Sequence, residues 1–411
     1  MKMEFRFLGG ADAIGRMGMI MTGAGKTLLV EYGMSPAKPP EYPMECPPVD
    51  HVLLTHCHLD HCGLVPQVCG RGDVELFSTP LTAEIGEIMM YDSLKIAKAE
   101  NYPAPYNAGD VDRTMRSVVP LTFGDTIELG KIDMTVHSAG HIPGAAMFEF
   151  IGDTSTVYSG DLHTIKQRLV DEAMPVGCEN LFIEGTYGGR THPDRDETEK
   201  DFLDKIAEVT DQGGTVLIPS FATGRTQEIM LLLRNSGYDM WVDGMGRSVT
   251  KKYLDYPEYV RDFKKLKAAK RKFNEVRNPS MRSLAKKADV IVTTGGMMDG
   301  GPVLNYLREF RNNPKNAVLM VGYQAEDTNG RMLLDSGSVM IDGEPVKVEC
   351  EVKKYDFSAH ADHQQIVEFI RRCDPKNVII MHSDTRELFL PDLADYNVML
   401  PKTGETFTLE V

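Results

Sequence analysis

The most constraining feature of the sequence is the run His56-Cys57-His58-Leu59-Asp60-His61, an HxHxDH motif. It directly follows the apolar stretch Val52-Leu53-Leu54, so its polar side chains lie just beyond the end of a predicted strand. Imidazole and carboxylate groups are the ligands that suit zinc, and a paired arrangement of them leaves room for a second ion. The motif therefore predicts a metal-dependent hydrolase, with candidate ligands His56, His58, Asp60 and His61.

Three later strand patterns also end at a residue that can bind a metal. They are residues 134–136 before His141, residues 156–157 before Asp161, and residues 378–381 before His382. Because strand ends at one edge of a sheet converge, we expect these three side chains to join the HxHxDH motif. Ordinary polar residues at strand ends are the alternative, but the joint pattern is hard to produce by chance.

The number of candidate ligands predicts a site for two ions. One ion would be held by His56, His58 and His141, the other by Asp60, His61 and His382, and Asp161 would bridge them. Two ions about 3.5–4 Å apart can share a water, lower its pKa and clamp both oxygens of an in-line displacement. This suits phosphodiester hydrolysis, in which charge stabilisation is most of the task. The ligand set favours zinc, with manganese as the other candidate.

Length and composition indicate a soluble enzyme of about two domains. The chain has 411 residues, 42% of them hydrophobic and 26% charged, and is too long for one ordinary core. No apolar run reaches the length of a membrane span, and the first residues lead into a strand pattern without a signal peptide. The seven cysteines are irregularly spaced and include no CxxC pair. We therefore expect a cytoplasmic protein with no membrane association.

The charge distribution gives two opposing indications about nucleic acid. The formal net charge of −15 argues against a polyanionic partner. Residues 247–287, however, contain fourteen basic and four acidic residues, a local excess of ten positive charges. A solvated helix face is the ordinary interpretation, but the concentration of one sign also indicates a polyanion partner. The candidate RNA contacts in this segment are Arg247, Lys264, Lys265, Lys270 and Arg271.

The order of predicted elements indicates one domain interrupted by another. The first third shows short strands, Gly-rich turns and an amphipathic helix over residues 82–101. From about Asp194 strands and helices alternate, as in a parallel α/β sheet. Strand patterns then return at residues 346–355, 378–381 and 397–400. We expect a first domain formed by residues 1–190 and 353–411, with an α/β domain inserted at residues 191–352.

Several motifs resemble those of the metallo-β-lactamase superfamily. The HxHxDH run, Gly140-His141 and Gly160-Asp161 are similar to its metal-binding motifs. Three further segments resemble motifs A, B and C of the β-CASP branch, and they are residues 182–188, 357–362 and 381–384. The resemblance covers nearly the whole chain. It implies an α/β fold in which an αββα sandwich carries an inserted parallel α/β β-CASP domain.

Within this branch the chain looks like the archaeal cleavage-and-polyadenylation-specificity-factor-like nucleases and ribonuclease J. The histidine of motif C, His382, is typical of RNA-processing members, so the resemblance implies RNA as the substrate. His360 of motif B would protonate the leaving 3′ oxygen, and Glu184 of motif A would orient and charge its imidazole. Asp60 would take part in catalysis as well as bind metal, and Ser358 would contact RNA.

The sequence departs from the family pattern at three places. Glu31 stands where the family usually has an aspartate that orients ligands without binding metal itself. A change in such a supporting residue can weaken metal affinity or activity by roughly 10–100-fold. Ser383 replaces the usual glycine after the motif C histidine. A third departure lies at residues 12–14, which differ from the usual opening of the family. None of the three departures removes a ligand.

The predicted activity is that of a zinc-dependent ribonuclease, acting as an endonuclease, a 5′→3′ exonuclease or both, through a hydroxide activated by two metals. A small-molecule metallohydrolase of the same fold is a second interpretation, against which the long insertion and the pair Glu184 and His360 argue. A non-catalytic RNA-processing scaffold is a third, but such homologues lose ligands. The expected partners are RNA and either a second copy of the chain or an RNA-processing complex.

Overall fold

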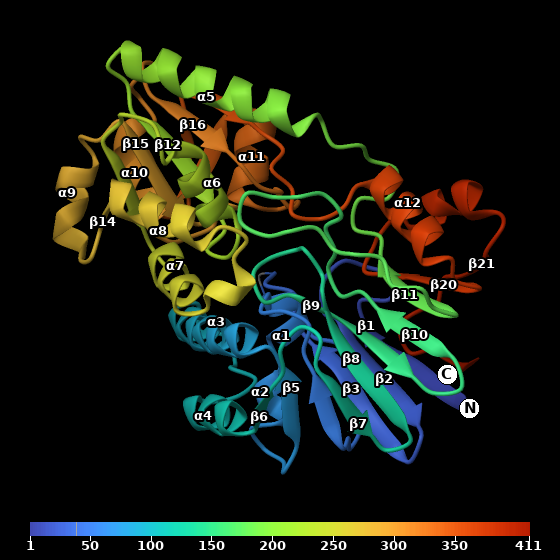
Figure 1. Cartoon of the computed structure of the whole chain (residues 1–411). Helices are drawn as coiled ribbons and strands as arrows, with labels where there is room; N and C mark the ends of the chain where they lie inside the picture. The colour runs from blue at the N-terminus through green and yellow to red at the C-terminus, as the bar shows by residue number, and fades with distance from the viewer. Residues whose placement is uncertain (38) are drawn as a thin grey trace. The chain divides into compact units, whose positions relative to one another are not determined.

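The protein divides into two compact units in the computed structural model, which describes residues 1–37 and 39–411. The first, here termed the sandwich unit, comprises residues 1–166, 171–191 and 360–411. The second, the inserted unit, comprises residues 167–170 and 192–359. Figure 1 follows the chain from the sandwich unit in blue and green into the inserted unit, and back into the sandwich unit in red.

Two seven-stranded sheets form the centre of the sandwich unit. The first has the order β22 (Thr406–Glu410), β1 (Lys2–Gly9), β2 (Gly18–Gly23), β3 (Lys26–Tyr32), β4 (His51–Leu53), β5 (Glu75–Ser78) and β6 (Val118–Pro120). The second has the order β21 (Asn397–Met399), β20 (Asn377–Met381), β11 (Asn180–Glu184), β10 (Ser155–Tyr158), β9 (Ala146–Ile151), β8 (Ile132–Ser138) and β7 (Thr126–Leu129). In the second sheet β10, β11, β20 and β21 run parallel, whereas β7 to β10 alternate in direction.

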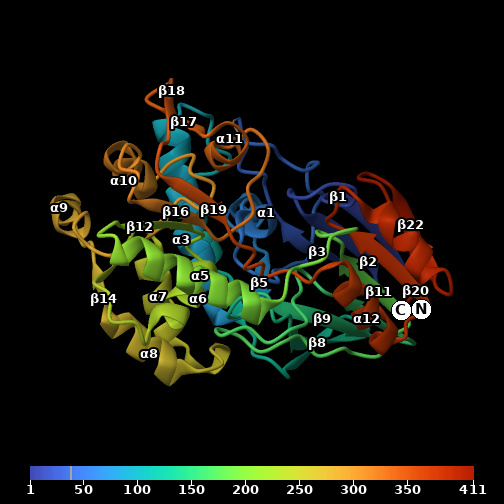
Figure 2. The same cartoon turned by 90° about the horizontal axis from the view of Figure 1, so that it is seen from above.

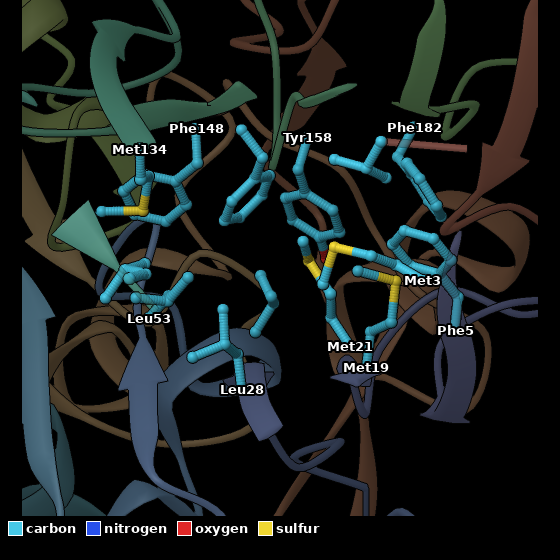
Figure 3. Packing of buried hydrophobic residues seen from close by; sticks show 14 of the residues in the cluster. Met3, Phe5, Met19, Met21, Leu28, Leu53, Met134, Phe148, Tyr158 and Phe182 are labelled. Carbon is cyan, nitrogen blue, oxygen red and sulfur yellow. The ribbon is translucent and has the colours of Figure 1, made fainter. Parts of the chain in front are cut away.

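The two sheets pack face to face around an apolar core. Alternate residues of β1, among them Phe5 and Phe7, are buried against the second sheet. The ring centroids of Phe5 and Phe182 lie 4.9 Å apart, which joins β1 to β11. Figure 3 shows side chains of both sheets, including Met19 and Phe148, meeting in this core. Their burial is the main reason that the two sheets hold together.

Helices cover the outer faces of the sheets and complete four layers. On the first sheet lie α1 (Leu59–Cys62), α2 (Val65–Val68), α3 (Pro80–Ala99) and α4 (Ala108–Arg116). A second apolar cluster, which includes Val52 and Val111, fills the space between these helices and the sheet. Figures 1 and 2 show α12 (His363–Cys373) beside β11 and β20. The predicted αββα sandwich is confirmed.

The inserted unit is built on a six-stranded parallel sheet. Its order is β14 (Phe273–Glu275), β13 (Met240–Asp243), β15 (Val290–Thr294), β12 (Val216–Ser220), β16 (Ala317–Met320) and β19 (Glu351–Lys354). The helices of the unit are α5 (Arg195–Asp211), α6 (Arg225–Leu233), α7 (Gly246–Asp255), α8 (Phe263–Lys272), α9 (Arg282–Ala285), α10 (Pro302–Phe310) and α11 (Asn329–Ser336). A separate hairpin joins β17 (Ser338–Ile341) to β18 (Glu344–Lys347). The predicted parallel α/β fold of the insertion is confirmed.

Local capping determines where two helices begin. The helix predicted over residues 82–101 begins two residues earlier, as α3, because Thr79 accepts a hydrogen bond from the amide of Thr82 and Pro80 fits the first turn. Helix α12 begins directly after Asp362, which forms a reciprocal capping box with Gln365. The cap fixes where α12 begins, and His360 lies two residues before the capping residue Asp362.

The single strand predicted over residues 346–355 is wrong. The structure has two strands there, β18 and β19, which belong to different sheets. Between them the amide of Val348 donates to the carbonyl of Gly337 at 2.9 Å, and that of Glu349 donates to the carbonyl of Arg311 at 2.7 Å. Because these two amides donate to other segments, the pairing of β18 with β17 ends before the pairing of β19 with β16 begins.

Candidate active site

Every predicted ligand lies just beyond a strand of the sandwich unit. The HxHxDH run follows β4, and its last two ligands lie in the short helix α1. His141, Asp161 and His382 follow β8, β10 and β20, whose carboxyl ends meet at one edge of the second sheet. The structure therefore brings all seven residues into one cluster.

Three histidines lie together beside Asp161, and two of them, His56 and His141, are close to one of its oxygens. The Nε2 atom of His56 and the Nε2 atom of His141 lie 3.1 and 3.2 Å from Nδ1 of His58. The Oδ2 atom of Asp161 lies 3.3 Å from Nε2 of His56 and 3.6 Å from Nε2 of His141. The pKa of His58 is lowered to about 3, mainly by burial and secondly by the charge of His56. His58 is therefore neutral at physiological pH, which is the form of imidazole that binds a metal.

The other oxygen of Asp161 faces the remaining residues. Its Oδ1 atom lies 3.3 Å from Nε2 of His61 and 3.4 Å from Nδ1 of His382. The Oδ2 atom of Asp60 lies 3.7 Å from Nε2 of His61 and 3.4 Å from Nε2 of His382. That nitrogen of His382 also accepts the amide hydrogen of Gly15 at 3.1 Å. Asp161 thus stands between two groups of residues, with one oxygen toward each.

Two buried polar atoms in the cluster lie 3.3 Å apart, yet neither forms a hydrogen bond that satisfies the usual geometry with any described residue. They are Nε2 of His61 and Oδ1 of Asp161, which belong to side chains only 1% and 2% exposed. An unpaired buried polar atom costs about 1–3 kcal/mol, so the pair points to a partner outside the protein chain. The donors available are imidazole nitrogens and carboxylate oxygens within 4.8 Å of one another. Such a donor set fits divalent metal ions.

Glu31 supports the cluster from behind. Its carboxylate is fully buried, and Oε1 accepts a hydrogen bond from Nδ1 of His61 at 2.8 Å. Thr55 donates to the same oxygen, and the hydroxyl of Tyr158 donates to Oε2 at 2.7 Å. With Nδ1 of His61 bonded to Glu31, Nε2 is the nitrogen of that ring directed toward Asp161. Burial alone would raise the pKa of Glu31, but the charges of His61 and His56 and the hydrogen bonds from His61 and Thr55 together outweigh burial, and the net pKa is lowered.

Glu31 reaches the cluster from an unusual backbone conformation. Glu31 has a φ of 62°, which is uncommon for a residue with a Cβ atom. Its carboxylate still reaches His61, so this departure from the family pattern keeps the supporting contact. Ser383, another departure, is fully buried and its hydroxyl accepts the amide hydrogen of Thr385 at 3.1 Å.

Two glycines allow the backbone to close around the cluster. A Cβ atom on Gly33 would lie 1.8 Å from the carbonyl oxygen of Asp60, so β3 can approach α1 only through a glycine. Gly160 has a φ of 55°, and a Cβ atom there would lie 2.8 Å from Oγ1 of Thr55. These close approaches explain why a glycine lies two residues after Glu31 and directly before Asp161.

His360 and Glu184 form a pair beside the cluster. The two carboxylate oxygens of Glu184 lie 2.9 and 3.1 Å from Nδ1 of His360. The carboxylate is fixed by the amide of Leu162 at 2.6 Å and by the hydroxyl of Thr186. The Nε2 atom of His360 lies 3.9 Å from Oδ2 of Asp161. Burial alone would lower the pKa of His360, but the Glu184 and Asp161 carboxylates outweigh it and raise that pKa to about 9.

Some side chains around the cluster were not predicted from the sequence. Tyr187 packs edge-on against His360 with 5.9 Å between ring centroids, and the guanidinium of Arg190 lies 5.9 Å from the Tyr187 ring centre. Tyr158 reaches Glu31 from the second sheet. Tyr158 ends the strand before Asp161, and Tyr187 lies in motif A, so closeness to a predicted motif is the signal that could have found both.

The predicted RNA contacts belong to the inserted unit. Lys264, Lys265, Lys270 and Arg271 all lie on α8. Arg247 lies on α7, where its Nε donates to the carbonyl of Gly244 at 3.3 Å. Ser358 follows β19, and its amide donates to Oδ1 of Asp356 at 3.0 Å. The structure thus places four of the five predicted basic residues on one helix.

Three family models match successive parts of the chain. A model of the metallo-beta-lactamase superfamily matches residues 18–219, and a Beta-Casp domain model matches residues 226–333. A model described as a Zn-dependent metallo-hydrolase RNA specificity domain matches residues 345–389.

Curated relatives are similar over almost the whole chain. "Probable RNase MJ4" of Methanocaldococcus jannaschii is 35% identical over 98% of this chain and 99% of its own length. "RNase aCSPSF2" of Saccharolobus solfataricus is 32% identical over 98% of this chain and 85% of its own. "Transcription termination factor FttA" of M. jannaschii is 32% identical over 95% of this chain and 68% of its own. A solved structure of a protein of unknown function from Enterococcus faecalis V583 shares the fold, with a TM-score of 0.65 at 15% identity over 100% of both chains.

The αββα fold and its cluster of histidines and carboxylates define a metal-dependent hydrolase. The chain belongs to the β-CASP branch of the metallo-β-lactamase superfamily, and the predicted ribonuclease class is confirmed. Among the helices of the described residues, none combines the length and the apolar character needed to cross a bilayer.

Proposed function

We propose that this chain is a zinc-dependent ribonuclease that hydrolyses RNA phosphodiester bonds in RNA processing or decay. The match to an RNA specificity domain and the similarity to relatives named as RNases support RNA as the substrate. The observation that carries the proposed chemistry is the His360–Glu184 pair, with His360 3.9 Å from Asp161. A proton donor at this position serves the departure of an alkoxide, the leaving group of phosphodiester hydrolysis.

The cluster is proposed to hold two zinc ions, with manganese as the alternative metal. The proposed ligands are His56, His58 and His141 for one position, Asp60, His61 and His382 for the other, and Asp161 for both. When bound, such ions lower the pKa of a shared water and stabilise negative charge on phosphoryl oxygens. Glu31 fixes the ring of His61 through its Nδ1 hydrogen, which keeps Nε2 directed into the cluster.

His360 is proposed to supply the proton that the leaving group needs. Glu184 holds Nδ1 of His360, so Nε2 is the nitrogen directed toward the cluster and the leaving 3′ oxygen. The buried carboxylate of Glu184 also balances the charge of the protonated imidazole. Asp60 is 25% exposed and Asp161 only 2%, so Asp60 is the carboxylate of the two that a substrate can reach. We therefore assign Asp60 a part in catalysis in addition to binding metal.

The proposed function is tested with end-labelled RNAs that carry a 5′ monophosphate, a 5′ triphosphate or a 5′ hydroxyl. Stepwise release of mononucleotides from the 5′ end would identify an exonuclease, and discrete internal fragments an endonuclease. A chromogenic ester tested in parallel addresses the small-molecule alternative. Turnover of the ester without cleavage of RNA would contradict the proposal. No turnover of either substrate by a fully metal-loaded protein would favour a scaffold.

A further inference from the structure

Helix α8 carries a row of cations that the fold leaves without ionic partners. Lys264, Lys267 and Arg271 are separated by three and four residues, so they lie along one face of the helix. All three are exposed, and none of them forms an ion pair within the part of the chain that the structure describes. These three residues are termed the α8 cationic row.

Several neighbouring basic residues, by contrast, form ion pairs within the inserted unit. The ion pairs are Lys265 with Asp262 at 2.6 Å, Lys270 with Glu275 at 3.6 Å, and Arg282 with Asp243 at 2.7 Å. The basic excess of residues 247–287 is therefore not a uniformly charged surface. Among the described residues, six exposed basic residues of this segment form no ion pair: four of them, Lys264, Lys267, Arg271 and Lys272, lie on α8, and Lys251 and Lys287 lie outside it.

The dimensions of the row suit a chain of phosphates. The row is about 10 Å long, because each helical residue rises about 1.5 Å. The phosphates of one stacked strand follow one another at about 3.4 Å along the helix axis, so a row parallel to that axis spans roughly three of them. At its end Arg271 borders a shallow hollow that also includes Phe273 and Arg277. Flexible cations in a line can follow a phosphate backbone without reading its bases.

We propose that the α8 cationic row binds the backbone of RNA at phosphates other than the scissile one. The inference rests on the proposed ribonuclease function. The whole chain carries a net charge of −15, which repels RNA, so attraction must come from a local concentration of positive charge. An acidic protein is the weaker candidate, because two of the four apolar residues of α8, Leu266 and Ala269, are buried and the other two, Phe263 and Ala268, are partly buried, so α8 presents no exposed apolar residue to the centre of a protein interface.

The test compares two triple variants of equal charge. In the first, Lys264→Ala, Lys267→Ala and Arg271→Ala remove the row. In the second, Lys200→Ala, Lys315→Ala and Lys347→Ala remove three exposed lysines from elsewhere in the inserted unit. Both are built on a His360→Ala background, and binding of an unstructured RNA of about 20 nucleotides is measured by fluorescence anisotropy from about 50 to about 200 mM salt.

We expect the row variant to bind RNA at least about tenfold more weakly at low salt, with a salt slope smaller by about two, because each phosphate contact in single strands contributes about 0.7. The control variant should keep the slope of the unsubstituted chain. Equal salt slopes in the two variants would overturn the inference. It would also be overturned if the row variant bound RNA normally but no longer bound poly-glutamate, which stands in for an acidic protein partner. If the alanine variant does not fold by circular dichroism, glutamine at the same three positions replaces it.

The binding measurement does not depend on cleavage, so the two proposals can fail separately. Failure of the unsubstituted chain to cleave any RNA would refute the proposed function and leave the binding result standing. Where cleavage is observed, the same three substitutions of the row, made in a chain that keeps His360, should raise KM for long RNA more than they change kcat, because the row contacts phosphates that do not react. A change confined to kcat would contradict the inference.

Discussion

The Nε2 atom of His360 lies 3.9 Å from Oδ2 of Asp161, yet the two side chains are held by different partners. His360 is oriented by Glu184, whereas Asp161 faces His56 with one oxygen and His61 with the other. The proposed proton donor and the proposed bridging carboxylate are therefore neighbours, but separate substitutions can test their two roles.

Replacing His360 with alanine should slow RNA cleavage without loss of metal. The imidazole lies beside the cluster but outside the proposed ligand set, and a general acid contributes about 10²–10⁴-fold to a rate. We expect kcat to fall by about that factor, while elemental analysis finds the zinc content unchanged. Normal cleavage by His360→Ala would contradict the assignment of the general acid.

Replacing Asp161 with alanine should release metal, because its two oxygens face both groups of ligands. We expect elemental analysis to find about one ion or fewer per chain, together with loss of RNA cleavage. Asp133→Ala, which removes an exposed aspartate from β8, is the control and should keep its metal. Full metal content in Asp161→Ala would argue against a bridging carboxylate.

Replacing Glu31 with glutamine should weaken metal binding by about 10–100-fold, since a charged acceptor behind His61 becomes a neutral amide. Tyr158→Phe removes only a hydroxyl that donates to the same carboxylate and should have a smaller effect. Competition with a fluorescent chelator measures both affinities. If Glu31→Gln binds zinc as tightly as the unchanged chain, the supporting role of Glu31 is wrong.

Replacing Gly33 with alanine should strongly destabilise the sandwich unit. The added Cβ atom would lie 1.8 Å from a backbone oxygen of Asp60, so the backbone itself must move. We expect a loss of more than about 3 kcal/mol, which corresponds to a fall in Tm of roughly 6 °C or more. Gly237→Ala, whose Cβ would have no atom within 4 Å, is the matched control. Similar melting of the two variants would refute this explanation of Gly33.

Glu199 should make the stability of the inserted unit depend on acid pH. Burial alone would raise the pKa of Glu199, but hydrogen bonds from Arg168 and Arg195 outweigh burial and the net pKa is lowered below 4.5. Because the folded-state pKa lies below the unfolded value, this stabilisation is fully present above about pH 4.5 and is lost as pH falls through the folded pKa.

The stability difference between the unchanged chain and Glu199→Gln should therefore shrink as the pH is lowered from about 6 to about 3. Urea unfolding of both proteins at several pH values measures this difference. A difference that stays constant over that range would show that ionisation of Glu199 does not contribute.

Much of the fold could be predicted because apolar runs mark buried strands. The strand patterns predicted at residues 156–157 and 378–381 lie within β10 and β20. The candidate ligands could be brought together for the same reason, since each directly follows such a run and strand ends at one sheet edge converge. Local sequence therefore carried most of the information about where the cluster lies.

The features that could not be predicted depend on contacts between distant segments. The strand is interrupted after β18 because the amide of Glu349 donates to the carbonyl of Arg311, and no residue near position 349 indicates this contact. Tyr158 lies far from Glu31 in the sequence, and only the packing of the two sheets brings its hydroxyl to that carboxylate. Likewise, which cations on α8 stay unpaired depends on where acidic residues such as Asp262 and Glu275 lie in the folded unit. A count of charged residues does not contain that information.

The pairing of β11 with β20 joins segments separated by 197 residues, with the inserted unit between them in the chain. Six of the seven proposed metal ligands follow β4, β8 and β10, so they precede residues 192–359 of the insertion in the chain. The proposed proton donor, His360, and the seventh proposed ligand, His382, come only after the insertion. A chain that ends before residue 360 would therefore contain most of the proposed ligands but lack the proposed proton donor.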